Sequence, residues 1–172
     1  GANTVEQSTD TPVGLGFTNS LKFTTTSADS SVAATDRVAM IYRVEGYDAA
    51  SLEFGTANAK TITISFYVKS SITGTHGGAV GNGSDNRAYP FTYTISSANT
   101  WERKSITIPG DTTGTWATNN ARSLQIAWGL GVGSTYSGTA GAWEAADRNS
   151  ATGATTGVLT TANATWFITG IQ

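Results

Sequence analysis

The chain has 172 residues, a formal net charge of −2 and only 13% charged residues, and its length suits one all-β domain. It has no cysteine, which excludes a disulfide framework, a thiolate metal site and a cysteine nucleophile. Lys and Arg are scattered, so we expect no nucleic-acid binding, and no apolar run approaches the roughly 20 residues of a membrane-spanning helix.

Alternating apolar and polar residues predict strands in the first half of the chain, because successive side chains of a strand point to opposite faces. Residues 1–16 are polar and include Pro12, so we expect an irregular entry segment. A first strand is predicted at Leu21 and Phe23, followed by a small polar loop over 25–36. Further elements are predicted at Arg37–Val44 (strand), Tyr47–Thr56 (short helical turn) and Thr61–Lys69 (strand).

Two of these strands allow the buried face to be assigned from the parity of their apolar residues. In Thr61–Lys69 (TITISFYVK) one face is aliphatic and aromatic, and the other carries hydroxyls with Tyr67 and Lys69. We expect the first face to line the core and the second to be open to solvent. In Arg37–Val44 we expect the core-facing set to be Val38, Met40, Tyr42 and Val44.

The second half of the chain alternates strands with turn signals. The glycine-rich run 74–85 predicts a weak strand near His76–Val80 and a turn at Asn82–Gly83. A long loop is expected over Gly131–Gly157. Strands are predicted at Tyr89–Ile95, Trp101–Ile108, Arg122–Leu130 and Thr165–Ile171. Seven to nine strands indicate one domain over 1–172, a two-sheet antiparallel β-sandwich of the jelly-roll type.

Three stretches of the sequence resemble a known group of domains. They are SLKF (20–23), the run from RVEGYDAASLEF to SSITGTHGG (43–78), and the run from NRAYPFTYTI to the closing FITGIQ. Their order resembles the jelly-roll carbohydrate-binding modules that accompany xylanases and glucanases. GTANAKTITISFYVKSS, ANTWERKSITIPGDTTGTW and GLGVGSTYSGTAGAW are more similar still to a domain of phage and prophage tail-fibre and virion proteins.

The resemblance implies a non-catalytic module that binds a cell-surface or plant or algal polysaccharide and belongs to a virion protein facing the extracellular medium. A secreted protein is the alternative location. The alternative function is a structural tail or virion domain that contacts other virion subunits and binds no sugar. The resemblance also implies a structural calcium ion, for which Glu6 and Asp10 could supply carboxylates.

Sugar binding requires flat aromatic faces and planar polar side chains that hydrogen-bond hydroxyl groups. On the face opposite the core, the parity analysis places Tyr67 for stacking and Arg43 and Gln125 for hydrogen bonds, provided that their strands share one sheet. The alternative is an ordinary solvated strand face. Further candidates are Trp143 and Tyr136 in the long loop, Arg87 after the glycine-rich run, and Trp128.

Each of these further candidates has a structural alternative. Trp143 could fold back over the edge of the sandwich, and Trp128 shares the core parity of Leu124 and Ile126. Arg87 could line the rim of a cleft, because it follows the flexible glycine-rich loop.

Catalysis is not expected. The only histidine, His76, has no cysteine partner and is expected in an exposed loop made mobile by Gly77 and Gly78. A glycosidase needs two carboxylates roughly 5 to 10 Å apart. None of the acids Glu45, Glu53, Glu102, Glu144 and Asp147 occupies the middle of a strand as expected of a cleft pair.

Overall fold

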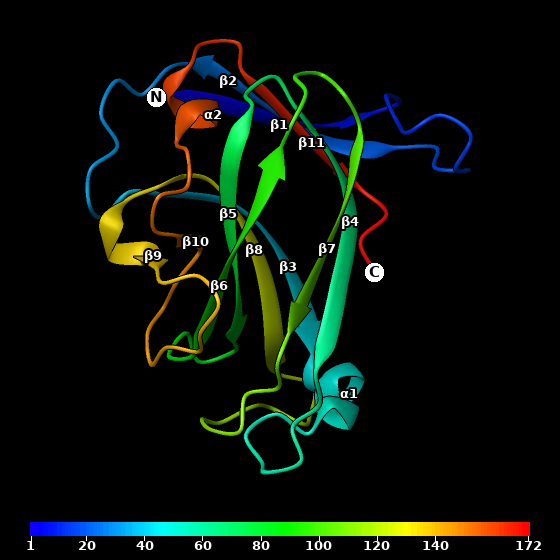
Figure 1. Cartoon of the computed structure of the whole chain (residues 1–172), viewed down its shortest axis with the longest axis vertical. Helices are drawn as coiled ribbons and strands as arrows, with labels where there is room; N and C mark the ends of the chain where they lie inside the picture. Colours follow the sequence, from blue (N-terminus) through cyan, green and yellow to red (C-terminus); the bar gives the residue numbers. More distant parts are fainter.

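The computed structural model describes residues 1–172 and contains two antiparallel sheets that enclose one apolar core (Figure 1). The first, which we call sheet A, has the strand order β1-β2-β11-β4-β7. The second, sheet B, has the order β3-β8-β5-β6. The jelly-roll sandwich predicted from the sequence is confirmed. The strands of sheet A are β1 (Ala2–Ser8), β2 (Ser20–Ser27), β4 (Ile62–Ser70), β7 (Glu102–Ile108) and β11 (Thr165–Thr169). Those of sheet B are β3 (Arg37–Glu45), β5 (Gly74–Asn82), β6 (Ala88–Ile95) and β8 (Arg122–Val132).

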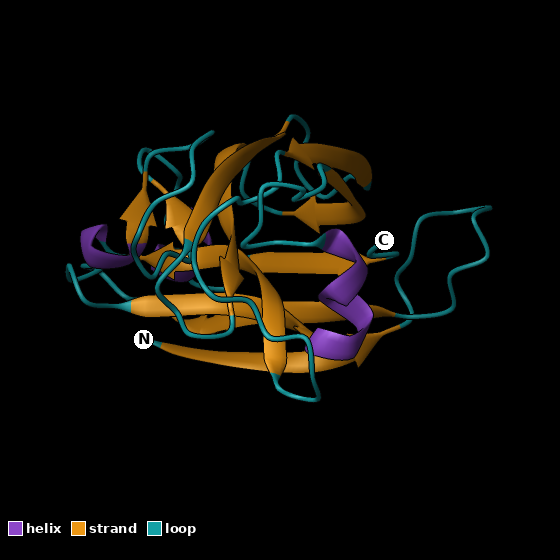
Figure 2. Cartoon of the chain, turned by 90° about the horizontal axis from the view of Figure 1, so that it is seen from below, coloured by secondary structure: helices purple, strands orange, loops and turns teal.

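Short elements complete the chain. α1 (Gly46–Ala49) and η1 (Ala50–Leu52) lie at one end of the sandwich and α2 (Gly157–Thr160) at the other (Figures 1 and 2). η2 (Ser134–Tyr136) follows β8, and β9 (Ser137–Gly138) pairs in parallel with β10 (Ser150–Ala151). No helix in the chain is both long enough and apolar enough to cross a membrane.

β4 lies between β11 and β7 in sheet A, and one of its faces lines the core, as its sequence pattern predicts. The opposite face, expected to be open to solvent, is largely covered: Ser65 and Lys69 are buried, and the β1–β2 loop packs over this face. Phe66 and Val68 are completely buried, and Ile64 is nearly so. The Phe66 ring meets Trp128 of sheet B edge-on at 5.4 Å and Tyr93 at 5.3 Å. Burying one such side chain stabilises the fold by roughly 1.5–3 kcal/mol, so contacts of this kind between the two sheets hold the sandwich closed.

Two sequence predictions about local structure are wrong. Residues 2–8, expected to be irregular, form β1 and pair with β2. Their side chains are almost all exposed, so backbone pairing rather than apolar alternation creates this strand. Tyr42, expected in the core, is 50% exposed because β3 is the edge strand of sheet B.

His76 is also placed differently from the prediction of an exposed, mobile loop. It lies in β5, between β6 and β8, and its side chain is completely buried against Tyr93, with ring centroids 5.5 Å apart. Its Nε2–H donates to the Ile72 carbonyl. The adjacent Gly77 has no side chain, which lets Ser150 pack directly on the strand. Glycine here gives close packing rather than mobility.

The segment 133–157 lies across the outer face of sheet B. A Cβ at Gly129 would come within 2.8 Å of the Ser150 side chain, so the segment sits tightly on β8. Ala88 of β6 forms a bridge with Glu144, exchanging two backbone hydrogen bonds of 3.0 and 2.7 Å. This outer face therefore offers only the part of β3 and β8 that the segment leaves uncovered.

Candidate functional site

Arg43 and Gln125, the two polar residues predicted to act together, are neighbours on the outer face of sheet B. The antiparallel register pairs Arg43 of β3 directly with Gln125 of β8. Arg43 is exposed and forms no ion pair, whereas Gln125 is only 4% exposed. A free guanidinium thus stands beside a fixed amide.

A polar network holds the Gln125 amide in place. Its Nε2 donates to Asp85 at 2.8 Å, and its Oε1 accepts from Arg122 at 3.1 Å. Arg122 also forms an ion pair with Asp85 at 2.6 Å and donates to the carbonyl of Gly83 in the β5–β6 turn. We call Arg43, Asp85, Arg122 and Gln125 the polar patch. Its guanidinium, carboxylate and amide groups are planar, and together they supply both hydrogen-bond donors and acceptors on one surface.

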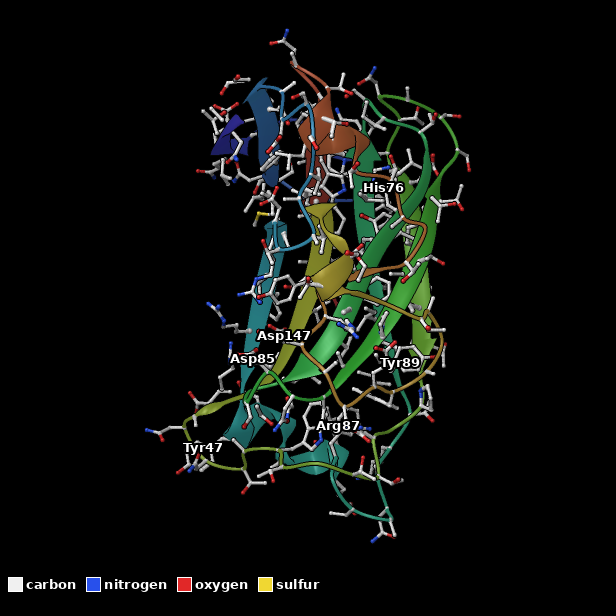
Figure 3. The ribbon with its side chains drawn as sticks, turned by 90° about the vertical axis from the view of Figure 1, so that its left-hand side faces the viewer. Tyr47, His76, Asp85, Arg87, Tyr89 and Asp147 are labelled. Atoms are coloured by element: carbon white, nitrogen blue, oxygen red, sulfur yellow. The ribbon has the colours of Figure 1, made fainter.

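A second polar group lies where the segment 133–157 passes β3. Arg37 donates to Asp147 at 2.6 Å, and its guanidinium lies 4.6 Å from the ring centre of Tyr136. Figure 3 looks onto this side of the molecule, with Asp85 and Asp147 labelled. The predicted residue Tyr136 therefore lies on the same side of the sandwich as the polar patch, but its ring is engaged by Arg37.

Tyr67 lies on the opposite side of the molecule. It belongs to β4 of sheet A, so the shared sheet that would join it to Arg43 and Gln125 does not exist. It is half-buried, and its ring centre is 5.5 Å from that of Phe17 in the β1–β2 loop. The same loop holds Asp10, which forms an ion pair with Lys69 and accepts a hydrogen bond from the Trp101 indole at 2.9 Å.

Trp128 and Trp143 both pack within the protein rather than forming a sugar-binding surface. Trp128 is 1% exposed within the core, so it presents no face to a ligand. Trp143 is half-buried, its Nε1 donates to the Pro109 carbonyl at 2.8 Å, and its ring packs edge-on against three other aromatic rings. Those rings belong to Phe54, Tyr89 and Trp116.

Arg87 has a buried structural partner rather than a place on a cleft rim. Its guanidinium donates two hydrogen bonds to Asp111, at 2.7 and 2.8 Å. Burial by itself raises the pKa of Asp111, but the hydrogen bonds from Arg87 and Thr113 outweigh it and leave the pKa below its usual value. This carboxylate therefore stays charged and holds the loop that follows β7.

The two acids named for calcium do not fit a calcium site. Glu6 forms an ion pair with Lys22 at 2.8 Å, and Asp10 forms one with Lys69. No group of three or more His, Cys, Asp or Glu side chains in the chain is arranged to hold a metal ion. A hard cation needs several oxygen ligands together, and here each carboxylate faces an ammonium group instead.

A pocket of about 180 Å³ at the α1 end escaped the sequence analysis. Residues of α1 and η1 line it together with Phe54, with Trp116 and Ala117 of the β7–β8 loop, and with Ser123 and Leu124 of β8. The signal that could have drawn attention to Trp116 is its position directly after the glycine-containing turn GDTTGT, which ends β7 and offers an aromatic ring from a loop.

Comparison with known proteins was made by sequence and by structure. Neither a scan against protein-family models nor a search of curated proteins found a match. Among solved structures, the enzymatically active domain of tailspike protein 4 of bacteriophage CBA120 aligns with 99% of this chain at a TM-score of 0.50 and 13% identity. The likeness is one of fold. This chain spans only 18% of that tailspike chain.

Two carbohydrate-binding modules align over the same length. A family 4 module matches 99% of this chain and 92% of its own, at a TM-score of 0.46 and 14% identity. The family 11 module of Clostridium thermocellum was solved in complex with a mixed-linked β-1,3-1,4 tetrasaccharide. It matches 99% of this chain and 81% of its own length, at a TM-score of 0.43 and 12% sequence identity.

Proposed function

We propose that this domain is a non-catalytic glycan-binding module of a virion protein, facing the extracellular medium. The observation that carries the proposal is the polar patch, in which the exposed, unpaired guanidinium of Arg43 lies beside the fixed amide of Gln125. Sugar hydroxyls both donate and accept hydrogen bonds, and this surface offers both kinds of partner. The virion context rests on the sequence resemblance to tail-fibre domains.

The arrangement suits binding rather than catalysis. Asp85, the carboxylate of the patch, is already bound by Arg122 and Gln125. A glycosidase needs a second carboxylate across a gap of about 5–10 Å that can exchange a proton with substrate. Four of the five acids singled out in the sequence form ion pairs: Glu53 with Lys60, Glu102 with Lys104, Glu144 with Arg148 and Asp147 with Arg37. The fifth, Glu45, is exposed at the end of β3.

Affinity electrophoresis on a panel of bacterial, plant and algal polysaccharides tests the proposal. We expect retardation on at least one polymer, weakened at least fivefold by Arg43→Ala because this side chain is free to bind hydroxyls. Arg103→Ala is the matched control: Arg103 is also exposed and unpaired, but it lies on sheet A opposite Tyr67. Equal loss in both variants, or no retardation on any polymer, contradicts the proposal.

A structural role in the virion is the second candidate, and one observation favours it. The β1–β2 loop projects from the body of the domain (Figures 1 and 2), and its tip carries Val13 at 98% exposure and Leu15 at 49%. Exposed apolar side chains at a loop tip suit contact with another protein. Light scattering after size-exclusion chromatography would favour this role if the chain self-associates and Val13→Asp makes it monomeric.

A further inference from the structure

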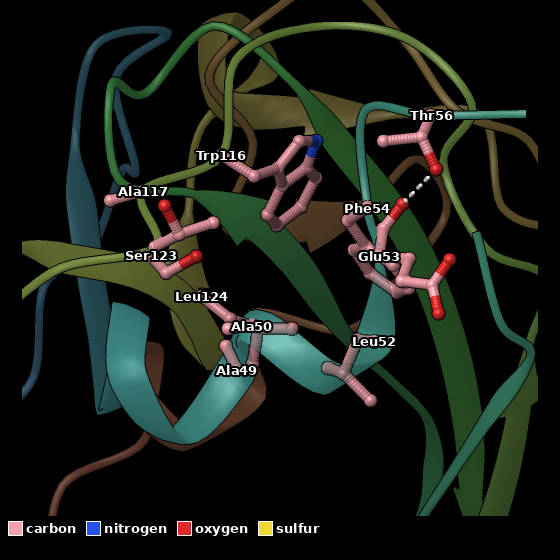
Figure 4. Close-up of a pocket in the computed structure, with 11 residues that line it drawn as sticks. Ala49, Ala50, Leu52, Glu53, Phe54, Thr56, Trp116, Ala117, Ser123 and Leu124 are labelled. Carbon is pink, nitrogen blue, oxygen red and sulfur yellow. Dashed lines mark hydrogen bonds between the residues drawn. The ribbon is translucent and has the colours of Figure 1, made fainter. Parts of the chain in front are cut away.

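The pocket at the α1 end is a built cavity rather than a surface irregularity. Phe54 and Trp116, its two aromatic walls, meet edge-on with ring centres 4.8 Å apart. The Trp116 indole Nε1 donates to the Thr113 carbonyl at 3.1 Å, which fixes the orientation of the ring. Figure 4 shows these rings and η1 surrounding the opening.

Both walls are attached to the same buried residue. The Asp111 carboxylate accepts hydrogen bonds from the backbone and hydroxyl of Thr113, at 3.1 and 2.9 Å, which holds the Trp116 side. The Asp111 carbonyl accepts from the Gly55 amide at 2.7 Å, which holds the Phe54 side. The Arg87 guanidinium then neutralises the carboxylate. A cavity whose walls are fixed from behind in this way is ready for a ligand without rearrangement.

The size of the pocket matches one six-membered ring. An apolar cavity of about 150 Å³ accommodates benzene, and this pocket measures about 180 Å³. Thr56 and Thr118 in its lining are exposed, so the pocket meets solvent beside them, and further sugar residues of a glycan can leave it there.

The chemistry of the lining selects among ring types. Most lining residues are apolar, so a fully hydroxylated sugar would bury hydroxyls against them without hydrogen-bond partners, which is unfavourable. Three polar lining residues are solvent-accessible: Thr56 and Thr118 are exposed and Glu53 is half-buried. One polar group lies deeper, because Ser123 is 2% exposed, makes no hydrogen bond with the chain and points its hydroxyl into the pocket (Figure 4).

From these features we infer that the Phe54–Trp116 pocket binds one sugar residue that carries a methyl group, either a 6-deoxyhexose or an N-acetylhexosamine. The methyl group packs against Phe54, Trp116 and Leu124, one polar atom of the sugar forms a hydrogen bond with Ser123, and the remaining hydroxyls face Thr56 and Thr118. This inference rests on the proposed function and adds to the polar patch a second subsite that recognises a defined residue of the glycan.

The test is a titration of the ¹⁵N-labelled protein with free monosaccharides, followed by NMR. Rhamnose, fucose and N-acetylglucosamine, which carry a methyl group, are compared with glucose and galactose, which carry none. We expect the Trp116 indole and Gly55 amide signals to shift with at least one methyl-bearing sugar. We expect affinity about tenfold above that of the hydroxylated sugars, since one apolar carbon in a fitted pocket is worth about 10-fold or more. Comparing rhamnose and fucose with N-acetylglucosamine separates a deoxy sugar from an N-acetyl sugar.

Two pairs of variants complete the design. Ala117→Leu and Ala50→Leu fill the pocket from opposite walls and should abolish the shifts, so one of them suffices if the other does not fold. Ala57→Leu is the control, because Ala57 is exposed and lies outside the pocket. Equal affinity for glucose, or unchanged binding in a folded Ala117→Leu or Ala50→Leu protein, overturns the inference.

The outcomes also separate the two proposals. If polysaccharide retardation depends on Arg43 but no methyl-bearing sugar shifts the Trp116 signal, the subsite inference is wrong and the proposed function stands. If the sugars bind at Trp116 and Arg43→Ala has no effect, the polar patch is wrong and the pocket is correct. If no sugar or polymer binds, both are wrong.

Discussion

Arg87 and Asp111 form a bidentate ion pair, with two hydrogen bonds of 2.7 and 2.8 Å, behind the Phe54–Trp116 pocket. The Asp111 side chain is 2% exposed and that of Arg87 16%. Burying such a pair costs desolvation energy that apolar residues would not incur. We interpret this ion pair as fixing the loops around Gly55 and Thr113 in one geometry. Such a role serves a preformed binding pocket, whereas stability alone would be served as well by apolar residues.

Removing one partner of this pair should be strongly destabilising. Arg87→Ala leaves a buried carboxylate without its cation, and we expect a loss of about 3 kcal/mol in the free energy of unfolding. Urea unfolding followed by tryptophan fluorescence measures it. The double variant Arg87→Met with Asp111→Leu should lose less than Arg87→Ala, because no buried charge remains. A single-variant loss below about 1 kcal/mol would show that the carboxylate is solvated instead.

The stability of the domain should depend on pH through His76. Burial lowers the pKa of His76 below its ordinary value of 6.5, and the Ile72 carbonyl opposes this only in part. Below pH 6.5 the unfolded chain therefore binds a proton that the folded chain excludes, so stability is full above this pH and falls as the pH drops.

We expect the His76→Gln variant not to lose stability as the pH falls from 7.5 to 5. The urea concentration at the unfolding midpoint, measured across this pH range, tests this. The hydrogen bond from Lys69 holds the pKa of Asp10 below its usual value. Burial raises the pKa of Asp111, but hydrogen bonds from Arg87 and Thr113 outweigh it, so this pKa is also below its usual value. Their contribution is present above about pH 4 and is lost below it, so it does not overlap this window. A wild-type midpoint that is flat from pH 7.5 to 5 contradicts the assignment.

Close packing of the segment 133–157 depends on Gly77. A Cβ there would lie 2.3 Å from the Ser150 hydroxyl and 2.7 Å from the Ala154 Cβ, so Gly77→Ala must displace that segment. We expect a loss of about 1–3 kcal/mol, as for other overpacking substitutions, and faster proteolysis within 133–157. Gly81→Ala is the control, since its nearest contact is 3.1 Å and a small shift relieves it. Equal effects of the two variants would refute this explanation.

The β1–β2 loop should be held to sheet A by Asp10. Lys69, its partner, is only 10% exposed, so Asp10→Ala leaves a nearly buried ammonium group unpaired. We expect a loss of about 1–3 kcal/mol and faster amide hydrogen exchange over residues 9–19. Glu6→Ala breaks a more exposed pair with Lys22 and should cost less than about 1 kcal/mol. If both variants exchange alike over 9–19, Asp10 does not hold the loop.

The strand pattern of the core was predictable because it is local. Ile64, Phe66 and Val68 alternate with polar residues, and only one face of a strand can be buried when that pattern holds. β1 was missed because its pairing with β2 uses backbone groups that every sequence has. His76 was misplaced because Gly77 and Gly78 signal flexibility locally, whereas in the fold the missing side chain of Gly77 admits the segment 133–157 and that of Gly78 admits the Phe91 ring.

By itself, the sequence determined the two-sheet sandwich, the core face of β4 and the polar character of the opposite faces, since the period of apolar residues carries that information. Only the tertiary structure decided which strands share a sheet: it joined Arg43 to Gln125 and separated both from Tyr67. It also assembled the Phe54–Trp116 pocket from two loops more than fifty residues apart. Strand order and loop contacts depend on long-range pairing, and no local pattern of residues encodes that pairing uniquely.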